Sequence, residues 1–139
     1  MKTPDIFYVE DDIDYAFFMQ SAVQEVKDNL NLIIVDDGAE ALQKLLDFAE
    51  SKTKPKLILL DLNLPGLSGL DLLKFIREIP YLKTVPVILF STSDNPEDVK
   101  ASIEFGANAY LTKPDGYENL LKCVHSVHDF WFNQHLRLN

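Results

Sequence analysis

The sequence predicts an α/β fold, in which a doubly wound parallel sheet of five strands is covered by helices on both faces. Three observations predict it. Five short apolar runs are spread along the 139 residues. Apolar residues between and after these runs recur three and four positions apart, which is the spacing of an amphipathic helix. The runs are also continuously apolar, as expected of parallel strands buried on both faces, and strand–helix alternation joins such strands through right-handed crossovers.

The first three expected strands are the apolar runs at 6–9, 32–35 and 57–60. A stretch with helical spacing follows the first run, and its expected inward residues are Tyr15, Met19, Ala22, Val23 and Val26. The turn signal Asp37-Gly38 closes the second run. A second helix follows this turn, with the expected inward residues Leu42, Leu45, Leu46 and Ala49.

The middle of the chain repeats the pattern. Ser68 and Asp71 resemble a capping box, and the helix behind them has the expected inward residues Leu72, Leu73, Ile76 and Ile79. The fourth and fifth strands are expected at 85–90 and 109–111. Between them, Asn95-Pro96 predicts an N-cap followed by proline at the first helical position. This helix is expected to turn Val99 and Ile103 inward and to end at Gly106.

The last helix is expected over roughly 117–132, with an apolar stripe of Tyr117, Leu120, Leu121, Val124 and Val127. Three adjacent aromatic residues, Phe130, Trp131 and Phe132, cannot all face inward on one helix. At least one is therefore expected to be exposed, which favours a partner surface. His125 and His128 are three positions apart but lack a third metal ligand nearby, so a surface or packing role is favoured.

Composition excludes several classes of protein. The net charge of −9 argues against a nucleic-acid surface, which needs clustered Lys and Arg. No apolar run is long enough to span a membrane. The single cysteine, Cys123, excludes an internal disulfide and fits the cytoplasm. We expect one domain over 1–139, with its core at about 5–132, a tail at 133–139 and no output domain.

Polar groups directly follow four of the expected strands. They are Glu10, Asp11 and Asp12, then Asp61, then Ser91, Thr92 and Ser93, and finally Thr112, Lys113 and Pro114. Because the carboxyl ends of parallel strands meet at one edge of the sheet, these groups are expected to converge there. The clustered carboxylates repel each other and need a counter-cation.

This set of groups suits phosphoryl transfer. A hard cation such as Mg²⁺ prefers oxygen ligands, and Asp11, Asp61 and the backbone carbonyl of Asn63 offer them. Asp61, at the tip of a central strand, is the best-placed nucleophile and would become an aspartyl phosphate. Ser91 would donate a hydrogen bond to one phosphoryl oxygen, and Lys113 would pair with another.

Four segments carry a family resemblance: "VEDD" at 9–12, "LDLNLPGLSG" at 60–69, "ILFSTSD" at 88–94 and "YLTKP" at 110–114. The chain resembles the receiver domain of two-component response regulators over about residues 5–132. The resemblance implies a (βα)5 flavodoxin-like fold with strand order 2-1-3-4-5. It also implies a signalling protein and not an enzyme in the ordinary sense. Such a protein takes a phosphoryl group from a histidine kinase, and it catalyses both the transfer to its own aspartate and the hydrolysis of the resulting aspartyl phosphate.

The resemblance also implies a role for each site residue. Asp61 is the phosphoacceptor, and Glu10 and Asp11 are the acidic pair, with Asp11 the direct ligand of Mg²⁺ and Asn63 a ligand through its carbonyl. Ser91 is the switch hydroxyl and Tyr110 the switch aromatic. Lys113 is the lysine whose ammonium pairs with the phosphoryl group, and it precedes an expected cis proline, Pro114.

Three segments of the chain, "DLNLP", "STS" and the terminal "FW", resemble the corresponding segments of small stand-alone response regulators that act together with bacterial phytochromes. The expected partner is therefore a sensor histidine kinase, of phytochrome type, or a phosphotransfer protein. We also expect a homodimer, or a complex with the kinase, through the fourth helix, fifth strand and last helix, with Tyr110, Trp131 and Phe132 at the interface. Leu64, Thr92 and Asp115-Gly116 depart from the family pattern, and Thr92 is expected to narrow access to Asp61.

Two other functions are weighed against this reading. An aspartyl-nucleophile phosphatase typically has a second acid two residues after its nucleophile, where this chain has Asn63. A nucleotide-binding module of the same fold needs a glycine-rich first loop, but residues 10–14 read "EDDID".

Overall fold

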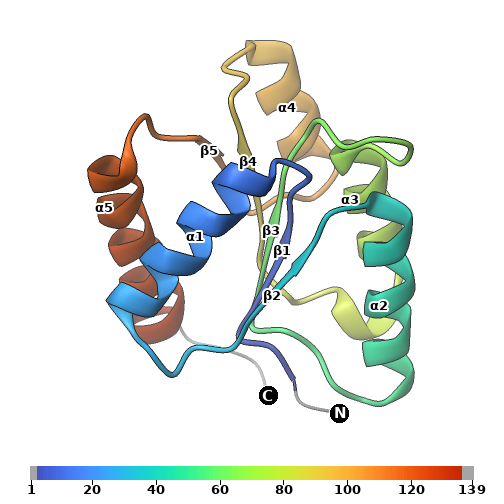
Figure 1. Cartoon of the computed structure of the whole chain (residues 1–139). Helices are drawn as coiled ribbons and strands as arrows, with labels where there is room; N and C mark the ends of the chain where they lie inside the picture. Colours follow the sequence, from blue (N-terminus) through green and yellow to red (C-terminus); the bar gives the residue numbers. More distant parts are fainter. Residues whose placement is uncertain (1–2, 136–139) are drawn as a thin grey trace.

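The structure is a computed structural model, and it describes residues 3–135. Five parallel strands form one sheet in the order β2-β1-β3-β4-β5, as predicted. Helices α1 and α5 cover one face of the sheet, while α2 and α3 cover the other and α4 packs beside β5 (Figure 1). The elements are β1 (Ile6–Val9), α1 (Ile13–Val26), β2 (Leu32–Val35), α2 (Gly38–Glu50), β3 (Leu57–Leu60), α3 (Gly69–Glu78), the 3₁₀ turn η1 (Pro80–Leu82), β4 (Val87–Ser91), α4 (Pro96–Glu104), β5 (Ala109–Thr112), α5 (Tyr117–His128) and the π-helical turn η2 (Asp129–Gln134).

The three central strands are buried along their whole length, which explains their unbroken apolar sequence. The edge strands β2 and β5 are only partly buried. In the register of the sheet, Val9 at the end of β1 lies beside Val35 and Leu60, the last residues of β2 and β3. The residues that follow these strands therefore leave the sheet at the same level.

Side-chain caps start four of the helices. Asp12 accepts hydrogen bonds from the backbone N–H groups of Asp14 and Tyr15, and it thereby begins α1 directly after the acidic segment. The predicted caps at Ser68 and Asn95 are confirmed, since each side chain accepts a backbone N–H of the helix that follows. The dipeptide Asp37-Gly38 was expected as a turn, but Asp37 caps α2 and Gly38 is its first residue.

The buried faces of α2 and α4 differ from the prediction. Leu46 is 42% exposed, whereas Phe48 is buried and packs edge-on against Phe7 of β1. In α4, Ile103 is 48% exposed and Ser102 is fully buried. The Ser102 hydroxyl can be buried because it donates to the carbonyl of Asp98, 2.7 Å away. On both helices, contact with the rest of the fold decided which face is buried, and the spacing of apolar residues alone did not.

The last predicted helix changes character near its end. The α-helix stops at His128, and residues Asp129–Gln134 continue as a π-helical turn. Phe130 is 52% exposed, which confirms that the three adjacent aromatics do not all face inward. Trp131 and Phe132 are partly buried against the core between the sheet, α1 and α5. Of the expected tail, residues 136–139 lie outside the described part of the chain. Within residues 3–135, no helix is long and apolar enough to cross a membrane.

A half-buried arginine on α3 joins three distant segments. The Arg77 guanidinium donates to the carbonyls of Gly106 (2.8 Å) and Val85 (3.0 Å) and to the side-chain oxygen of Asn108 (2.9 Å). It also reaches the carbonyls of Leu82 and Lys83. Arg77 thereby ties α3 to the segment before β4 and to the α4–β5 connection. No local pattern in the sequence predicts this role for Arg77.

Candidate functional site

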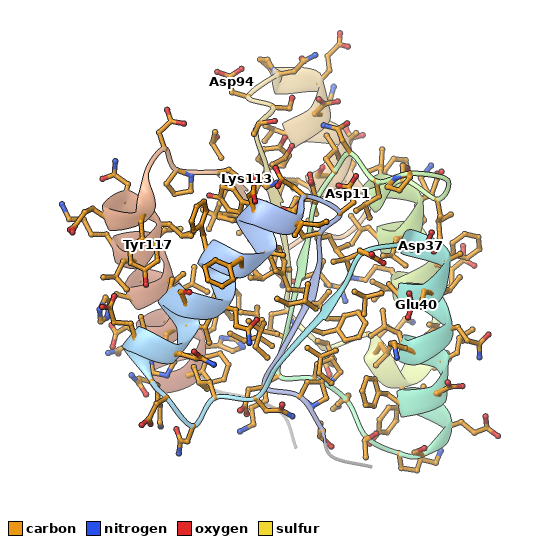
Figure 2. All side chains as sticks on the ribbon, in the orientation of Figure 1. Asp11, Asp37, Glu40, Asp94, Lys113 and Tyr117 are labelled. Carbon is orange, nitrogen blue, oxygen red and sulfur yellow. The ribbon has the colours of Figure 1, made fainter. Side chains whose placement is uncertain are left out.

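Three carboxylates meet at the carboxyl edge of the sheet. Glu10 follows β1 and Asp61 follows β3, and these strands end in register. One carboxylate oxygen from each of Glu10, Asp11 and Asp61 lies within 4.8 Å of the other two. Glu10 and Asp61 are buried, whereas Asp11 is exposed, so the cluster opens to solvent through Asp11. Figure 2 shows Asp11 and Lys113 at this same edge.

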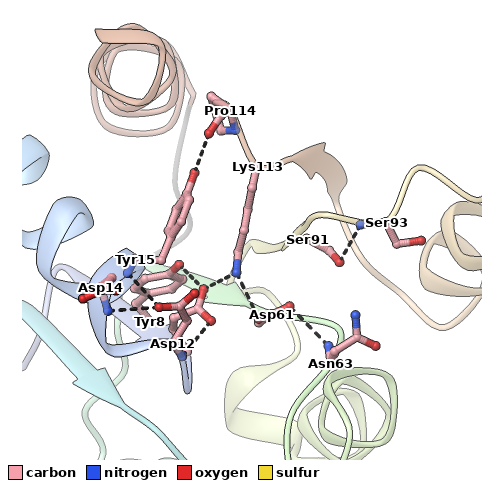
Figure 3. Close-up of polar contacts among 11 residues, drawn as sticks. Tyr8, Asp12, Asp14, Tyr15, Asp61, Asn63, Ser91, Ser93, Lys113 and Pro114 are labelled. Atoms are coloured by element: carbon pink, nitrogen blue, oxygen red, sulfur yellow. Dashed lines mark hydrogen bonds and ion pairs between the residues drawn. The ribbon is translucent and has the colours of Figure 1, made fainter. Parts of the chain in front are cut away.

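Lys113 brings one positive charge to the cluster. Its Nζ lies 3.1 Å from Asp61 Oδ2 and closer still to Glu10 Oε1, and its side chain is 6% exposed (Figure 3). The backbone N–H of Lys113 donates to the Ser91 carbonyl at 2.7 Å, and the Nζ lies 4.7 Å from the centre of the Tyr15 ring. Burial acts to lower the pKa of Lys113, but the bonds to Glu10 and Asp61 outweigh burial and raise it. The ammonium is therefore charged at neutral pH.

A buried tyrosine holds Glu10 in place. Tyr8 Oη donates to Glu10 Oε1 at 2.6 Å, and the Asp12 N–H donates to the other carboxylate oxygen at 3.3 Å. Burial, together with the neighbouring Asp61, raises the pKa of Glu10 to about 7, although the bonds from Lys113 and Tyr8 act in the opposite direction. Burial and the adjacent Glu10 also raise the pKa of Tyr8 far above its ordinary value. Tyr8 was not among the predicted site residues, although residues two apart on a strand share one face, so Tyr8 lies on the same face as Glu10.

The arrangement fits a divalent cation. Asp61 Oδ1 accepts the backbone N–H of Asn63 at 3.2 Å, so the predicted ligand residue Asn63 lies directly beside the nucleophile candidate. Three carboxylates against one ammonium leave an excess of negative charge. Hard divalent ions bind such oxygen clusters. The predicted set Glu10, Asp11, Asp61 and Asn63 is thus brought together by the fold.

Ser91 ends β4 and is fully buried. Its Oγ accepts the N–H of Ser93 at 3.2 Å (Figure 3). Tyr110, on the neighbouring strand β5, donates its hydroxyl to the Ser93 carbonyl at 2.7 Å. The two residues predicted as a switch pair are therefore both bonded to Ser93. Thr92, the next residue, is exposed.

The expectation of a cis proline is wrong. Residues 3–135 contain no cis peptide bond, and the Lys113–Pro114 bond is trans. The trans form is the ordinary ground state of a bond that precedes proline. In this form Lys113 reaches both buried carboxylates, and the Pro114 carbonyl accepts the Tyr15 hydroxyl at 3.2 Å.

A groove of about 410 Å³ adjoins the carboxylates between α1, the end of β2 and the start of α2. Its acidic lining residues are Glu10, Asp11, Asp36 and Glu40. Its apolar lining includes Ile13 and Phe17, which are 81% and 65% exposed. The apolar stripe in the α1 sequence marks the buried side of the helix and gives no signal for the exposed residues Ile13 and Phe17 at the rim of an acidic site.

The fold and this site together define a receiver-type signalling domain. The chain belongs to the response regulator receiver domain family, whose family model matches residues 6–125. It is 38% identical over 128 residues to the response regulator Rcp1 of Synechocystis sp. strain PCC 6803, a match that covers 91% of this chain and 87% of Rcp1.

Solved structures agree. The phosphorylated cyanobacterial phytochrome response regulator RcpA superposes with a TM-score of 0.88 at 33% identity, covering 97% of this chain and 98% of RcpA. The Mn²⁺-bound form of Rcp1 superposes with a TM-score of 0.80 at 35% identity, covering 98% of this chain and 100% of Rcp1. The bacteriophytochrome response regulator RtBRR gives 0.75 at 31% identity, covering 100% of this chain and 82% of RtBRR.

Membership of this family decides among the functions weighed from the sequence. The chain is a response regulator of two-component signalling with an aspartyl phosphoacceptor and an acidic metal cluster, and receiver domains take their phosphate from histidine kinases. The phosphatase and nucleotide-binding readings are set aside, and the protein is not an enzyme in the ordinary sense.

Proposed function

We propose that Asp61 accepts a phosphoryl group from the phosphohistidine of a sensor histidine kinase, with Mg²⁺ as the cation. One observation carries the proposal: a buried carboxylate at the tip of a central strand is bridged by Lys113 and lies within 4.8 Å of two further carboxylates. An Asp61 oxygen attacks phosphorus, a P–O bond forms, and the P–N bond of the donor breaks with its electron pair returning to the imidazole nitrogen.

The other residues position and neutralise the transferred group. When bound, Mg²⁺ offsets the charge that would keep a phosphoryl anion away from the acids, with Asp11, Asp61 and the Asn63 carbonyl as its ligands. Lys113 pairs with a phosphoryl oxygen, and Ser91 donates to another. The same site then admits water, so that the protein hydrolyses its own aspartyl phosphate.

The test is phosphorylation by acetyl phosphate with Mg²⁺, followed by intact-protein mass spectrometry. We expect one added phosphoryl group in the parent and none in Asp61→Asn. The matched control is Asp36→Asn, which removes an exposed acid near the groove and should be phosphorylated like the parent. Equal phosphorylation of Asp61→Asn would overturn the assignment.

We propose that the partner is a cytoplasmic sensor histidine kinase of phytochrome type, or a phosphotransfer protein. RcpA and RtBRR, which this chain resembles, are phytochrome response regulators by name. The exposed side chains of Ile13 and Phe17 beside the acidic groove support docking of a protein close to Asp61. Free Cys123 suits a reducing compartment.

This docking is testable with Phe17→Ser. The variant should lose transfer from a phytochrome kinase but keep phosphorylation by acetyl phosphate, because only the protein donor needs the surface. Phe75→Ser is the control, since Phe75 is 44% exposed on α3 and belongs to the opposite face of the sheet. Loss of both reactions in Phe17→Ser would point to a folding defect instead.

We also propose a homodimer through the face formed by α4, β5 and α5, with Tyr110, Trp131 and Phe132 at its interface. The 52% exposure of Phe130 next to Trp131 supports an apolar contact surface at this end of α5. Sedimentation of the parent and of a Trp131→Ala, Phe132→Ala variant, with and without beryllofluoride, measures it. If both remain identical monomers in every condition, the interface does not exist.

A further inference from the structure

Tyr15, in the first turn of α1, contacts both Lys113 and the residue that follows it. The centre of the Tyr15 ring lies 4.7 Å from Lys113 Nζ, and the Tyr15 hydroxyl donates to the Pro114 carbonyl at 3.2 Å (Figure 3). Burial raises the pKa of Tyr15, so its hydroxyl is protonated and acts as a donor at neutral pH. These two contacts join α1 to the segment that follows β5.

Aromatic packing holds the Tyr15 ring in place. The ring packs edge-on against Phe90 of β4, with 5.8 Å between the ring centres. Phe90 is buried and also packs edge-on against Tyr8, whose hydroxyl donates to Glu10. Both members of the ion pair between Glu10 and Lys113 therefore contact a tyrosine, and the two tyrosines share one buried neighbour.

The Lys113 side chain is long and flexible, and fixing it in one place costs about 2 kcal/mol of rotamer entropy. Its ion pair with Asp61 involves the carboxylate that phosphorylation would convert to an aspartyl phosphate. The contact with Tyr15 involves no carboxylate, and a cation over an aromatic ring gains about 0.5 to 2 kcal/mol. Tyr15 can therefore restrain the ammonium with either form of Asp61.

We propose that Tyr15 is a positioning residue that holds the Lys113 ammonium where it pairs with a phosphoryl group on Asp61. This inference rests on the proposed phosphorylation of Asp61. Tyr15 acts through Lys113 and does not itself contact the phosphoryl group. A tyrosine that only packed α1 against the segment before α5 would affect stability without acting through the lysine, and this difference can be measured.

The first experiment measures the affinity for beryllofluoride in the presence of Mg²⁺. Tyr15→Leu keeps an apolar side chain but removes the aromatic face, and it should bind about fivefold more weakly than the parent. Tyr15→Phe keeps the ring and should bind within about twofold of the parent. If Tyr15→Leu binds like the parent, or if Tyr15→Phe binds as weakly as Tyr15→Leu, the positioning role is overturned.

A double-mutant cycle tests whether Tyr15 acts through the lysine. In a Lys113→Ala background, Tyr15→Leu should cause no further loss of beryllofluoride affinity, because the group that it positions is already absent. An equal fold loss in both backgrounds would overturn the role.

Tyr117→Leu is the matched control. Tyr117 also joins α5 to α1, since its hydroxyl donates to Glu25 at 3.3 Å, but it lies apart from Lys113 (Figure 2). Tyr117→Leu should leave the affinity for beryllofluoride unchanged. If it weakens binding as much as Tyr15→Leu does, the effect comes from contact between the two helices, and the role of Tyr15 is overturned.

Proton NMR of the ligand-free protein gives a second readout, which needs no phosphoryl group. Protons above the face of an aromatic ring resonate upfield. We therefore expect upfield ε-methylene signals for Lys113, assigned by their absence in Lys113→Ala, in the parent and in Tyr15→Phe. In Tyr15→Leu these signals should return to the ordinary lysine position, and unchanged signals would overturn the role.

The two proposals can fail separately. A parent that does not bind beryllofluoride overturns the proposed function. A parent that binds it, together with a Tyr15→Leu variant that binds equally tightly, overturns the role of Tyr15 alone.

Discussion

Two partly buried cationic side chains lie at opposite ends of the strands and differ in their surroundings. Lys113 lies at the carboxyl ends of the strands, and Arg77 lies near their amino ends. Lys113 contacts two buried carboxylates, Glu10 and Asp61, beside a third acid. Arg77 contacts neutral oxygens, namely four backbone carbonyls and the side chain of Asn108. Burial accordingly lowers the pKa of Arg77, while the carboxylates raise that of Lys113.

The difference separates a structural cation from a functional one. Each of the three guanidinium nitrogens of Arg77 donates to a protein oxygen, so this cation is used to join segments of the fold. The site around Lys113 keeps an excess of negative charge and one solvent-exposed acid, Asp11. That excess of negative charge favours the binding of a further cation.

The largest effect on stability is expected from Arg77→Ala. The change leaves several carbonyls without a donor and should lower the free energy of unfolding by about 3 kcal/mol. Urea unfolding measures it, and phosphorylation by acetyl phosphate at low temperature should persist. Arg77→Lys should recover only part of the loss, because an ammonium cannot span these acceptors. If Arg77→Ala unfolds at the same urea concentration as the parent, Arg77 is not the structural cation that the comparison with Lys113 makes it.

Lys113→Ala should damage signalling more than folding. Loss of the ion pair to the phosphoryl group should weaken phosphorylation-dependent partner binding by about 2 kcal/mol, roughly 30-fold, while Asp61 still accepts phosphate. The loss in folding stability should be smaller, since Glu10, whose pKa is already raised to about 7 by burial, can take up a proton. Normal phosphate-dependent binding, measured by titration with the kinase, would contradict this role.

Asp11→Asn should act on the metal alone. Removing one carboxylate ligand should weaken Mg²⁺ binding about tenfold, or about 1.4 kcal/mol, by isothermal titration calorimetry, and it should block phosphorylation. The ligand-free variant should unfold at the same or a slightly higher urea concentration, because one repulsion within the cluster is relieved. Parental Mg²⁺ affinity would show that Asp11 is not a ligand.

The smallest effect is expected from Tyr8→Phe. It removes the 2.6 Å hydrogen bond to Glu10 in a fully buried place and should lower the free energy of unfolding by about 1 kcal/mol. Tyr81→Phe is the control, since that hydroxyl donates to the Lys52 carbonyl at 2.6 Å in an exposed setting. Urea unfolding measures both variants. If Tyr81→Phe lowers the free energy of unfolding more than Tyr8→Phe does, burial of the hydroxyl does not decide how much stability its removal costs.

Much of the site could be predicted from the order of residue types. In a parallel sheet, each polar group that follows an apolar run reaches the same edge, so the approach of Asp61, Asp11 and Lys113 follows from local sequence and topology. The cis form of Lys113–Pro114 was predicted from resemblance and is wrong, because the trans backbone already brings the lysine to both carboxylates.

The sequence by itself determined the strands, most helix starts and the residues that reach the carboxyl edge, because these depend on neighbours a few positions apart. Only the tertiary structure decided what depends on distant partners. Arg77 contacts Gly106 and Asn108 some thirty residues along the chain, and Tyr110 of β5 contacts Ser93, which follows the neighbouring strand β4. Likewise, Phe48 rather than Leu46 became buried because of its contact with Phe7. Such pairings depend on how the helices pack on the sheet. The spacing of apolar residues in the sequence does not indicate which distant residue will contact which.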